Sequence, residues 1–433
     1  MWWARCGSSS PRRVEMRRFA KYLEVLAVTL LDKFRSVRQF AFLVHDPSML
    51  DHYAGVWKAL GSARFAIVLT EDFYLDESGA EKNGVGSFMT HVWHEGYEVH
   101  HVRDIVSLGI RFPYVVTNHP IAGYTSERKP LTPEDIAKKC RNRWLAALGR
   151  PMAWRFEVAI DTYLPLQIGE RHIRYMYGAD LSDAWSLQPW NEIYDLFLCH
   201  GVNDERIVSQ RFHGKTFIMG YPRYDAFFEP GLDVSRVREE FRLVEGRKTL
   251  LWMPTLGGTG SSIPVFAQPF AALFDRFNVI VRPHPLSFMQ EPQFIAQLER
   301  LGFEIDRNAT RSMNELYRVS DVVFADYGGT PFSSIFVGKN LCFLDVPGAD
   351  DLAINAGSTV LDLKKRLPVL GADDLATLPN LLASDEFLAR NRQRVDELFG
   401  TYFGGQRGGG SARLADYLKR IDDMMNEGKR PRE

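Results

Sequence analysis

Residues 320–340 of this 433-residue chain read SDVVFADYGGTPFSSIFVGKN, and this stretch decides the fold expected for the second half. The apolar run from Val322 to Ala325 predicts a buried strand, and the acid and two glycines after it predict a tight turn. Thr330 and Pro331 are residue types favoured at the N-cap and first position of a helix. Backbone N–H groups at a helix start attract anions, and glycines let a ligand approach closely. The stretch therefore predicts either a phosphate site or an ordinary packing turn.

The length and composition indicate a globular protein of two domains, each of about 200 residues. Hydrophobic residues make up 45% of the chain and charged residues 25%. The chain has 53 Lys and Arg residues and 54 Asp and Glu residues, so its net charge is close to zero. This balance does not favour nucleic acid as a partner. The cysteines form no Cys-x-x-Cys pair, which argues against a zinc site or a disulfide framework and favours the reducing cytoplasm. They are Cys6, Cys140, Cys199 and Cys342.

Residues 1–36 form a basic, amphipathic segment with two interpretations. Four arginines between positions 12 and 18 precede apolar residues at helical spacing, from Phe19 to Leu30. The segment either lies on an anionic membrane surface, through residues 11–38, or packs on its own domain. Charged residues interrupt the apolar run, which is shorter than the roughly 20 residues that span a bilayer, and no signal-peptide cleavage site follows. The predicted location is therefore the cytoplasm, either free or peripheral on the inner face of the membrane.

Short apolar runs alternate with helical patterns from Gln39 onward, which predicts an α/β fold with parallel sheets. In the first half, strands are expected at 40–44, 64–70, 97–102, 112–117, 172–177, 193–199 and 216–219, and helices at 48–60 and 136–148. The charged stretch 236–247 is expected to link two Rossmann-like domains. The predicted domains are residues 37–245 and 246–409, followed by a C-terminal helix and tail at 410–433.

Three predicted strands of the second half end in residues suited to binding an anion. Thr255 and the glycine-rich loop 256–262 follow one strand, Arg282 and His284 follow the next, and the Asp326 turn follows the third. Because the carboxyl ends of parallel strands meet at one edge of a sheet, these segments are expected to share a crevice. Prolines on both sides hold His284, which suits phosphate binding and proton donation. The alternative is that each segment is a structural turn.

Polar residues also follow strands in the first half. His119 stands where open sheets place ligand-facing residues, although an ordinary loop histidine is the alternative. Arg223 follows a rigid Gly-Tyr-Pro turn and is of the type that grips phosphate. Four further histidines lack metal-ligand spacing, so no metal site is predicted. They are His91, His94, His100 and His101.

Four motifs in this order resemble those of the CDP-glycerol glycerophosphotransferases of teichoic-acid and capsule synthesis, over residues 220–417. The matching segments are Gly220-Tyr221-Pro222-Arg223-Tyr224-Asp225, Pro254-Thr255, Arg282-Pro283-His284-Pro285, and Ser320-Asp321 with Asp326-Tyr327. The resemblance implies the GT-B fold, in which two Rossmann-like domains face a central cleft. It also implies an enzyme that moves glycerol phosphate, or a related polyol phosphate, from a CDP-activated donor to a hydroxyl acceptor in cell-surface polymer synthesis.

The resemblance also implies roles for residues. The C-terminal domain would bind a CDP- or UDP-linked donor, with no other cofactor and no metal, and the N-terminal domain would receive a polymer or lipid-linked acceptor. Arg282 and His284 would neutralise the pyrophosphate, with His284 also catalytic. The expected substrate-binding residues are Arg223, Thr255, Arg282, Asp326, Gly328, Gly329, Thr330, Ser333 and Ser334.

Two departures from the family pattern leave alternatives open. Tyr177 stands where the family has a catalytic histidine, and a tyrosine of ordinary pKa, about 10, is a poor general base. The proton would then go to another group, for which the candidates are His172, His119 and His200, or the chemistry differs. Gly328 and Gly329 replace two family serines, which favours a nucleotide-sugar glycosyltransferase or epimerase on the same fold. A non-catalytic GT-B module that binds polymer or nucleotide is the third alternative.

Overall fold

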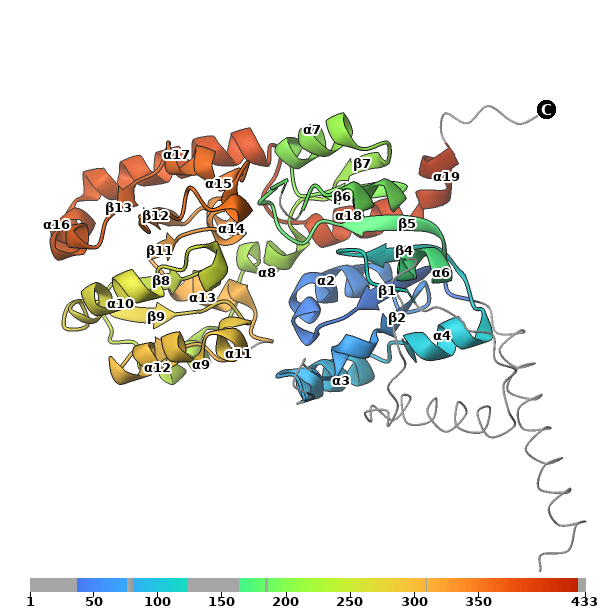
Figure 1. Cartoon of the computed structure of the whole chain (residues 1–433), viewed down its shortest axis with the longest axis horizontal. Coiled ribbons are helices and arrows are strands. Elements are labelled where there is room, and N and C mark those ends of the chain that lie inside the picture. Colours follow the sequence, from blue (N-terminus) through green and yellow to red (C-terminus); the bar gives the residue numbers. More distant parts are fainter. Residues whose placement is uncertain are drawn as a thin grey trace, which may run out of the picture. The chain divides into compact units, whose positions relative to one another are not determined.

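The computed structural model describes residues 37–75, 79, 81–123, 163–183, 186–308 and 310–426. It contains two β-sheets flanked by helices (Figure 1). The chain divides into two compact units, Met1–Asp46 with Ser62–His172, and Pro47–Gly61 with Ile173–Glu433. The helices predicted in residues 1–36 and at 136–148 lie outside the described residues, as do Cys6 and Cys140.

Seven strands form the first sheet, in the order β3-β2-β1-β4-β5-β6-β7. Their bounds are β1 Phe40–Val44, β2 Phe65–Leu69, β3 Val99–His101, β4 Phe112–Thr117, β5 Gly169–Tyr175, β6 Leu196–Cys199 and β7 Lys215–Ile218. Strand β1 pairs in parallel with β2 and β4, β2 with β3, and β6 with β5 and β7. Strands β1 and β4 have their predicted bounds, because each is a short apolar run rich in β-branched or aromatic residues.

Six strands form the second sheet, in the order β10-β9-β8-β11-β12-β13, and all its pairs are parallel. Their bounds are β8 Thr249–Met253, β9 Asn278–Val281, β10 Glu304–Ile305, β11 Val322–Ala325, β12 Asn340–Leu344 and β13 Val369–Leu370. The helices of this part are α10 Ile263–Ala271, α11 Ser287–Gln290, α12 Pro292–Arg300, α13 Met313–Val319, α14 Thr330–Val337, α15 Val360–Lys364, α16 Leu378–Ala383 and α17 Asp385–Tyr402.

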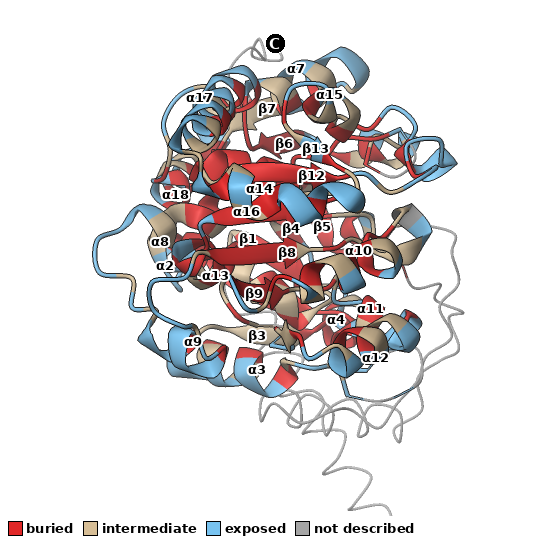
Figure 2. Ribbon diagram, turned by 90° about the vertical axis from the view of Figure 1, so that its left-hand side faces the viewer, coloured by how far each residue is buried: buried red, intermediate tan, exposed pale blue. Residues whose placement is uncertain are grey.

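Successive residues of the second sheet face two separate apolar cores. On β11, Val323 and Ala325 belong to one core, whereas Val322 and Phe324 belong to the other. This follows from the alternation of side chains along a strand. Helices α13, α14 and α17 cover the first core, and α10, α12 and α16 cover the second. Both faces of its central strands are therefore buried, as a parallel sheet requires, and Figure 2 shows β8 and β12 largely in red.

Helix α2, Leu50–Leu60, belongs to the second unit although β1 before it belongs to the first. Its buried residues are His52, Tyr53, Val56, Trp57 and Leu60. They recur at the spacing of a helix stripe, in which His52 is the polar exception. A Cβ atom added to Gly55 would lie 2.6 Å from the Oγ of Ser411 on α18, Gly410–Lys419, so this glycine lets the two helices approach closely.

The remaining helices complete both parts of the chain. Their bounds are α3 Val85–His94, α4 Val102–Leu108, α6 Leu164–Ile168, α7 Val202–Arg211, α8 Asp225–Phe228, α9 Ser235–Glu240 and α19 Ile421–Asn426. The segment 236–247, which the sequence predicts to be a linker, begins within α9, and its Val237 and Phe241 are buried in a core of the second sheet. Across the ranges that the structure describes, no helix is long and apolar enough to cross a membrane.

Candidate functional site

A cavity of about 420 Å³ lies within the second compact unit. One wall consists of the last residue of β8, Met253, and of segments that follow β8, β9 and β11: Pro254 to Leu256, Arg282 to Leu286, and Tyr327 to Thr330. These are the three strand ends that the sequence predicts to share a crevice, and the parallel sheet brings them together at its carboxyl edge. The volume of the cavity is in the range typical of small-molecule sites.

Asp326 does not line the cavity, but it is hydrogen-bonded to segments that form this wall. Its side chain is fully buried, and its carboxylate accepts the backbone N–H groups of Thr255, Ser262 and Tyr327, each at 2.8 Å. Burial raises its pKa to about 6. The structure therefore gives Asp326 a different position from the one expected, because it holds loops that line the cavity without lining the cavity itself.

The turn after Asp326 presents backbone to the cavity. Gly328 has a φ of 81°, which glycine adopts without strain, and Gly329 is the N-cap of α14. The helix thus begins at Thr330, and the predicted N-cap is one residue too late. Gly328, Gly329, Thr330 and Ser333 line the cavity, but Ser334 does not.

The two serines of α14 are already hydrogen-bonded within the protein. The hydroxyl of Ser333 lies 2.6 Å from the hydroxyl of Tyr317 and donates to the carbonyl of Thr330 at 2.9 Å. The hydroxyl of Ser334 donates to the same carbonyl, also at 2.9 Å. A ligand at this helix start would therefore meet mainly backbone N–H groups and the positive end of the helix dipole.

His284 is oriented to donate a hydrogen bond. The backbone N–H of Leu286 donates to its Nδ1 at 3.2 Å, so the proton of the neutral ring lies on Nε2. Burial lowers the pKa of His284, while Glu291 acts in the opposite direction. A neutral imidazole with an Nε2–H group can donate to an anionic oxygen without carrying a full charge.

Arg282 lines the cavity, but its charge is partly compensated inside the protein. Its guanidinium forms an ion pair with the buried Asp306 and donates to the carbonyl of Asn308 at 3.0 Å. The Arg282 side chain is only 10% exposed. It can add positive potential to the cavity, although less than a free arginine would.

The opposite wall comes from α2, from the segment after β5 and from η4, Pro222–Tyr224. Arg223 lines the cavity here, and its Nε donates to Asp51 of α2 at 2.5 Å. Its guanidinium carbon lies 5.7 Å from the ring centre of Tyr224. These contacts fix the arginine at the cavity wall.

His52 and Tyr177 form a stacked pair on this wall. Their ring centres are 4.7 Å apart, with an angle of 25° between the rings. His52 is 2% exposed, and its Nδ1 is buried with no hydrogen-bond partner in the part of the chain that the structure describes. Sequence reasoning missed His52, and the only available signal was a histidine on the apolar stripe of a predicted helix.

Asp180 is a second lining residue that the sequence did not indicate. Its carboxylate accepts the hydroxyl of Ser358 at 2.9 Å and that of Thr359 at 3.2 Å. Burial raises its pKa to about 6. These bonds join the loop after β5 to the start of α15.

The other candidate histidines do not line the cavity. His172 and His119 belong to the first unit, where Nε2 of His172 lies 3.1 Å from the carbonyl of Pro165 and the ring of His119 packs on His45. His200 is enclosed, with its Nδ1 3.0 Å from a carboxylate oxygen of Asp204.

The histidine cluster of the first unit contributes to its local structure. His101 accepts the backbone N–H of Arg103 and caps α4, and His100 pairs with Glu98 at 2.7 Å. Within the described ranges, no group of three His, Cys, Asp or Glu side chains could hold a metal ion.

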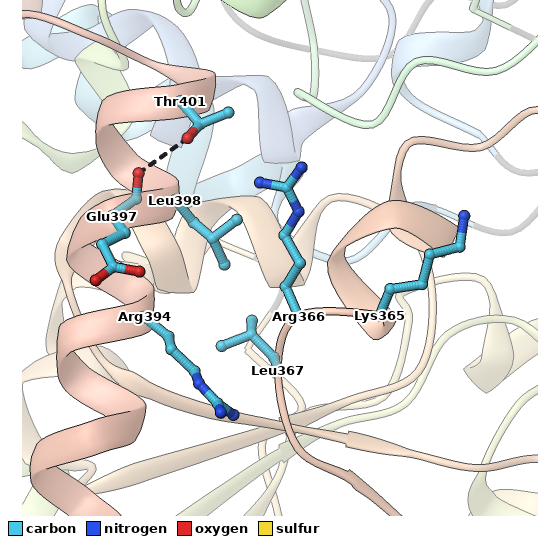
Figure 3. A pocket seen from close by; sticks show the side chains of 7 residues that line it. All are labelled: Lys365, Arg366, Leu367, Arg394, Glu397, Leu398 and Thr401. Carbon is cyan, nitrogen blue, oxygen red and sulfur yellow. Dashed lines mark hydrogen bonds between the residues drawn. The ribbon is translucent and has the colours of Figure 1, made fainter.

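A second cavity, of about 370 Å³, has a different character (Figure 3). It is lined by Lys365, Arg366, Leu367, Arg394, Glu397, Leu398 and Thr401. Only the segment after α15 and one face of α17 contribute to it, and Thr401 donates to the carbonyl of Glu397 at 3.0 Å. It contains neither a histidine nor a strand end, so the larger cavity is the better candidate site.

Two parallel α/β sheets, with a cavity at the carboxyl ends of the second, define the chain as a GT-B-type protein. The chain belongs to the CDP-glycerol:poly(glycerophosphate) glycerophosphotransferase family, whose sequence profile matches residues 182–416, more than half of its length. The family and fold class predicted from the sequence are thereby confirmed.

Individual relatives agree with this assignment. A teichoic acid poly(ribitol-phosphate) polymerase of Bacillus spizizenii strain W23 is 23% identical over 228 residues, which cover 50% of this chain and 34% of the relative. The match thus spans about a third of that relative's length.

Solved structures share the fold at low identity. The wall teichoic acid polymerase TagF is 14% identical, with a TM-score of 0.52 and coverage of 95% of this chain and 99% of that chain. A structure of S. aureus MnaA with UDP is 12% identical, with a TM-score of 0.51 and coverage of 92% of this chain and 100% of that chain.

Proposed function

We propose that this protein is a transferase that moves a polyol phosphate from a CDP-activated donor to a hydroxyl acceptor in the synthesis of a cell-surface polymer of the teichoic-acid or capsule type. The proposal rests on the cavity at the ends of three strands, in a chain that belongs to the glycerophosphotransferase family. Two similar proteins support this substrate class by analogy. One is TagF, of which a structure was soaked with CDPG, and the other is named a teichoic acid poly(ribitol-phosphate) polymerase.

The donor diphosphate would lie against the wall formed by the second sheet. The N–H groups at the start of α14 and the Nε2–H of His284 would donate to its oxygens, and Arg282 would add positive potential. Gly328 and Gly329 have no side chain, so the diphosphate can approach the backbone. Catalysis would then rest mainly on stabilising the negative charge of the departing nucleotide.

The acceptor would approach from the wall that carries Arg223 and Tyr177. An acceptor built from polyol phosphates carries negative charges, which Arg223 could attract. We expect a polymer or lipid-linked acceptor and a reaction in the cytoplasm or on the inner face of the membrane. The free, buried thiols of Cys199 and Cys342 are compatible with this location.

A nucleotide-sugar glycosyltransferase or epimerase is the second candidate. The glycine pair at positions 328 and 329 and the shared fold with the UDP-bound MnaA structure favour it. The substrate would then be a UDP-sugar in the same cavity. A protein that binds donor without turning it over would instead fit the third alternative, a non-catalytic binding module.

A donor panel separates these functions. The purified chain is incubated with CDP-glycerol, CDP-ribitol and a UDP-N-acetylhexosamine, and its thermal unfolding and nucleotide release are measured. A ligand at a hundred times its dissociation constant should add about 2.7 kcal/mol to the free energy of unfolding. Stabilisation by a CDP-polyol, with release of CMP when an acceptor is added, supports the proposal. Stabilisation by the UDP-sugar alone would favour the second candidate.

A further inference from the structure

We propose that His52 is the general base of the cavity, the group that removes the proton of the acceptor hydroxyl as this hydroxyl attacks the donor. The inference rests on the transferase function proposed above and adds a catalytic residue to it. Tyr177 lines the same wall, but a tyrosine holds its proton too tightly at neutral pH to act as this base.

The geometry of the His52 ring supports this role. The ring lines the cavity, although only 2% of the residue is exposed. Its Nδ1 is enclosed, with no hydrogen-bond partner among the described residues. We assign the contact with the acceptor to Nε2, the other ring nitrogen. Stacking on Tyr177 holds the plane of the ring, and placement on α2 fixes its backbone.

The groups around His52 keep it neutral. Burial lowers its pKa well below the usual value, and the nearby Arg223 and His200 lower it further. Asp51 is already paired with Arg223, and the hydroxyl of Tyr175 donates to the backbone carbonyl of His52. A bound diphosphate brings negative charge into the cavity, which would raise the pKa of His52 toward the working pH. His52 is thus unprotonated before the donor binds, and the bound diphosphate makes its ring more basic.

The other titratable groups of the cavity are less suited to the task. Asp180 already accepts two hydroxyl groups, those of Ser358 and Thr359. Nδ1 of His284 accepts the N–H of Leu286, so its Nε2 carries the proton and acts as a donor. Burial raises the pKa of two lining tyrosines, Tyr221 and Tyr224.

The proposed step conserves atoms and charge. The acceptor oxygen forms a bond to the phosphorus that carries the polyol, while the bond from this phosphorus to the bridging oxygen breaks. The electron pair of the broken bond leaves with CMP. The hydroxyl proton passes to Nε2 of His52 and is later released to water.

The test compares His52→Gln with His213→Gln in the full-length protein, using CDP-glycerol or the polyol donor selected by the panel. His213 is a suitable control because its side chain is 95% exposed and lies outside the cavity. We expect His52→Gln to lower kcat by about 10²- to 10⁴-fold, while thermal stabilisation by the donor remains. His213→Gln should behave like the unaltered protein.

Two further measurements guard against a merely structural effect. Added imidazole should restore part of the activity of His52→Ala, because it can occupy the space of the missing ring. The acid limb of the kcat profile, which reports the donor-bound complex, should persist in Asp180→Asn and disappear from the residual activity of His52→Gln. If His52→Gln does not fold, imidazole rescue of His52→Ala and the Asp180→Asn profile decide the question.

The outcomes distinguish the two proposals. If the unaltered protein transfers polyol phosphate and His52→Gln does so equally fast, His52 is not the base, although the proposed function stands. A loss of the acid limb in Asp180→Asn would likewise assign the base to Asp180. If the unaltered protein transfers nothing from any donor of the panel, the proposed function fails and this inference fails with it.

Discussion

The carboxylate of Asp326 accepts the backbone N–H of Thr255 at 2.8 Å, which ties the turn after β11 to the loop after β8. The same carboxylate also reaches Ser262, at the start of the segment that leads into α10. A single buried acid thus fixes the spacing of two strand ends that form one wall of the cavity. Its contribution is to hold in place the backbone of a cavity wall that it does not itself line.

Replacing Asp326 with Asn should therefore weaken both folding and donor binding. An amide has only one acceptor oxygen, so at least one of the three N–H groups would lose its partner, at a cost of about 1–3 kcal/mol. Urea unfolding would measure the loss of stability, and thermal stabilisation by the donor would measure the loss of binding. The exposed Asp373, changed to Asn, is the control. Equal stability of the two variants would contradict a stabilising role for the three hydrogen bonds to Asp326.

The adjacent glycines allow backbone strain to be separated from ligand contact. Gly328→Ala should cost about 1–2 kcal/mol of stability, because an L-residue is strained at a φ of 81° even though the nearest atom, Oγ of Thr255, is 3.8 Å away. Gly329 has a φ of −77°, so Gly329→Ala should fold normally. Its added methyl group lies on the cavity wall and should weaken donor binding. Normal donor affinity in the folded Gly329→Ala variant would argue against a diphosphate at this turn.

His284→Asn tests the proposed hydrogen-bond donor. The asparagine oxygen can replace Nδ1 as acceptor for Leu286, but the variant lacks the Nε2–H group. Removing one donor to the developing charge should lower kcat by about 10²- to 10³-fold. Steady-state release of CMP measures this effect, with His213→Gln as the control. A variant as fast as the unaltered protein would remove His284 from the mechanism.

The raised pKa of Asp180 predicts how the free energy of unfolding depends on pH. Burial raises its pKa from 3.8 to about 6, so between these values the folded protein keeps a proton that the unfolded chain releases. The free energy of unfolding should therefore fall as the pH rises through this window, by up to about 3 kcal/mol from this group.

Asp180→Asn should remove that contribution, and urea unfolding at several pH values measures it. Burial also raises the pKa of Asp326 to about 6, so this residue contributes a similar pH dependence. The slope of unfolding free energy against pH should therefore decrease in Asp180→Asn without vanishing. A slope unchanged from that of the unaltered protein would contradict the raised pKa of Asp180.

The strand ends of the second sheet were predictable because each is a local pattern. An apolar run followed by Gly or Pro shows where a strand stops, and parallel pairing then brings Thr255, His284 and the Gly328 turn to one edge. The enclosed position of Asp326 was not predictable, because its three N–H partners come from distant loops as well as from its neighbour.

The opposite wall of the cavity could not be predicted from local patterns. His52 and Asp180 reach it through packing between segments far apart in the chain, such as α2 and the loop after β5. His119 and His172 follow or begin apolar strands like true site residues, yet they belong to the first unit. A strand-end position is thus a useful signal only when the order of the strands in the sheet is known.

The placement of α2 in the second unit has a practical consequence for recombination. The cavity depends on residues from both Pro47–Gly61 and the chain beyond Ile173, and the segment Ser62–His172 of the first unit lies between them in sequence. A single crossover near residue 173 would therefore separate His52 from Tyr177 and Arg223. A chimera that takes this site from a related chain must therefore take both α2 and the C-terminal part from that chain.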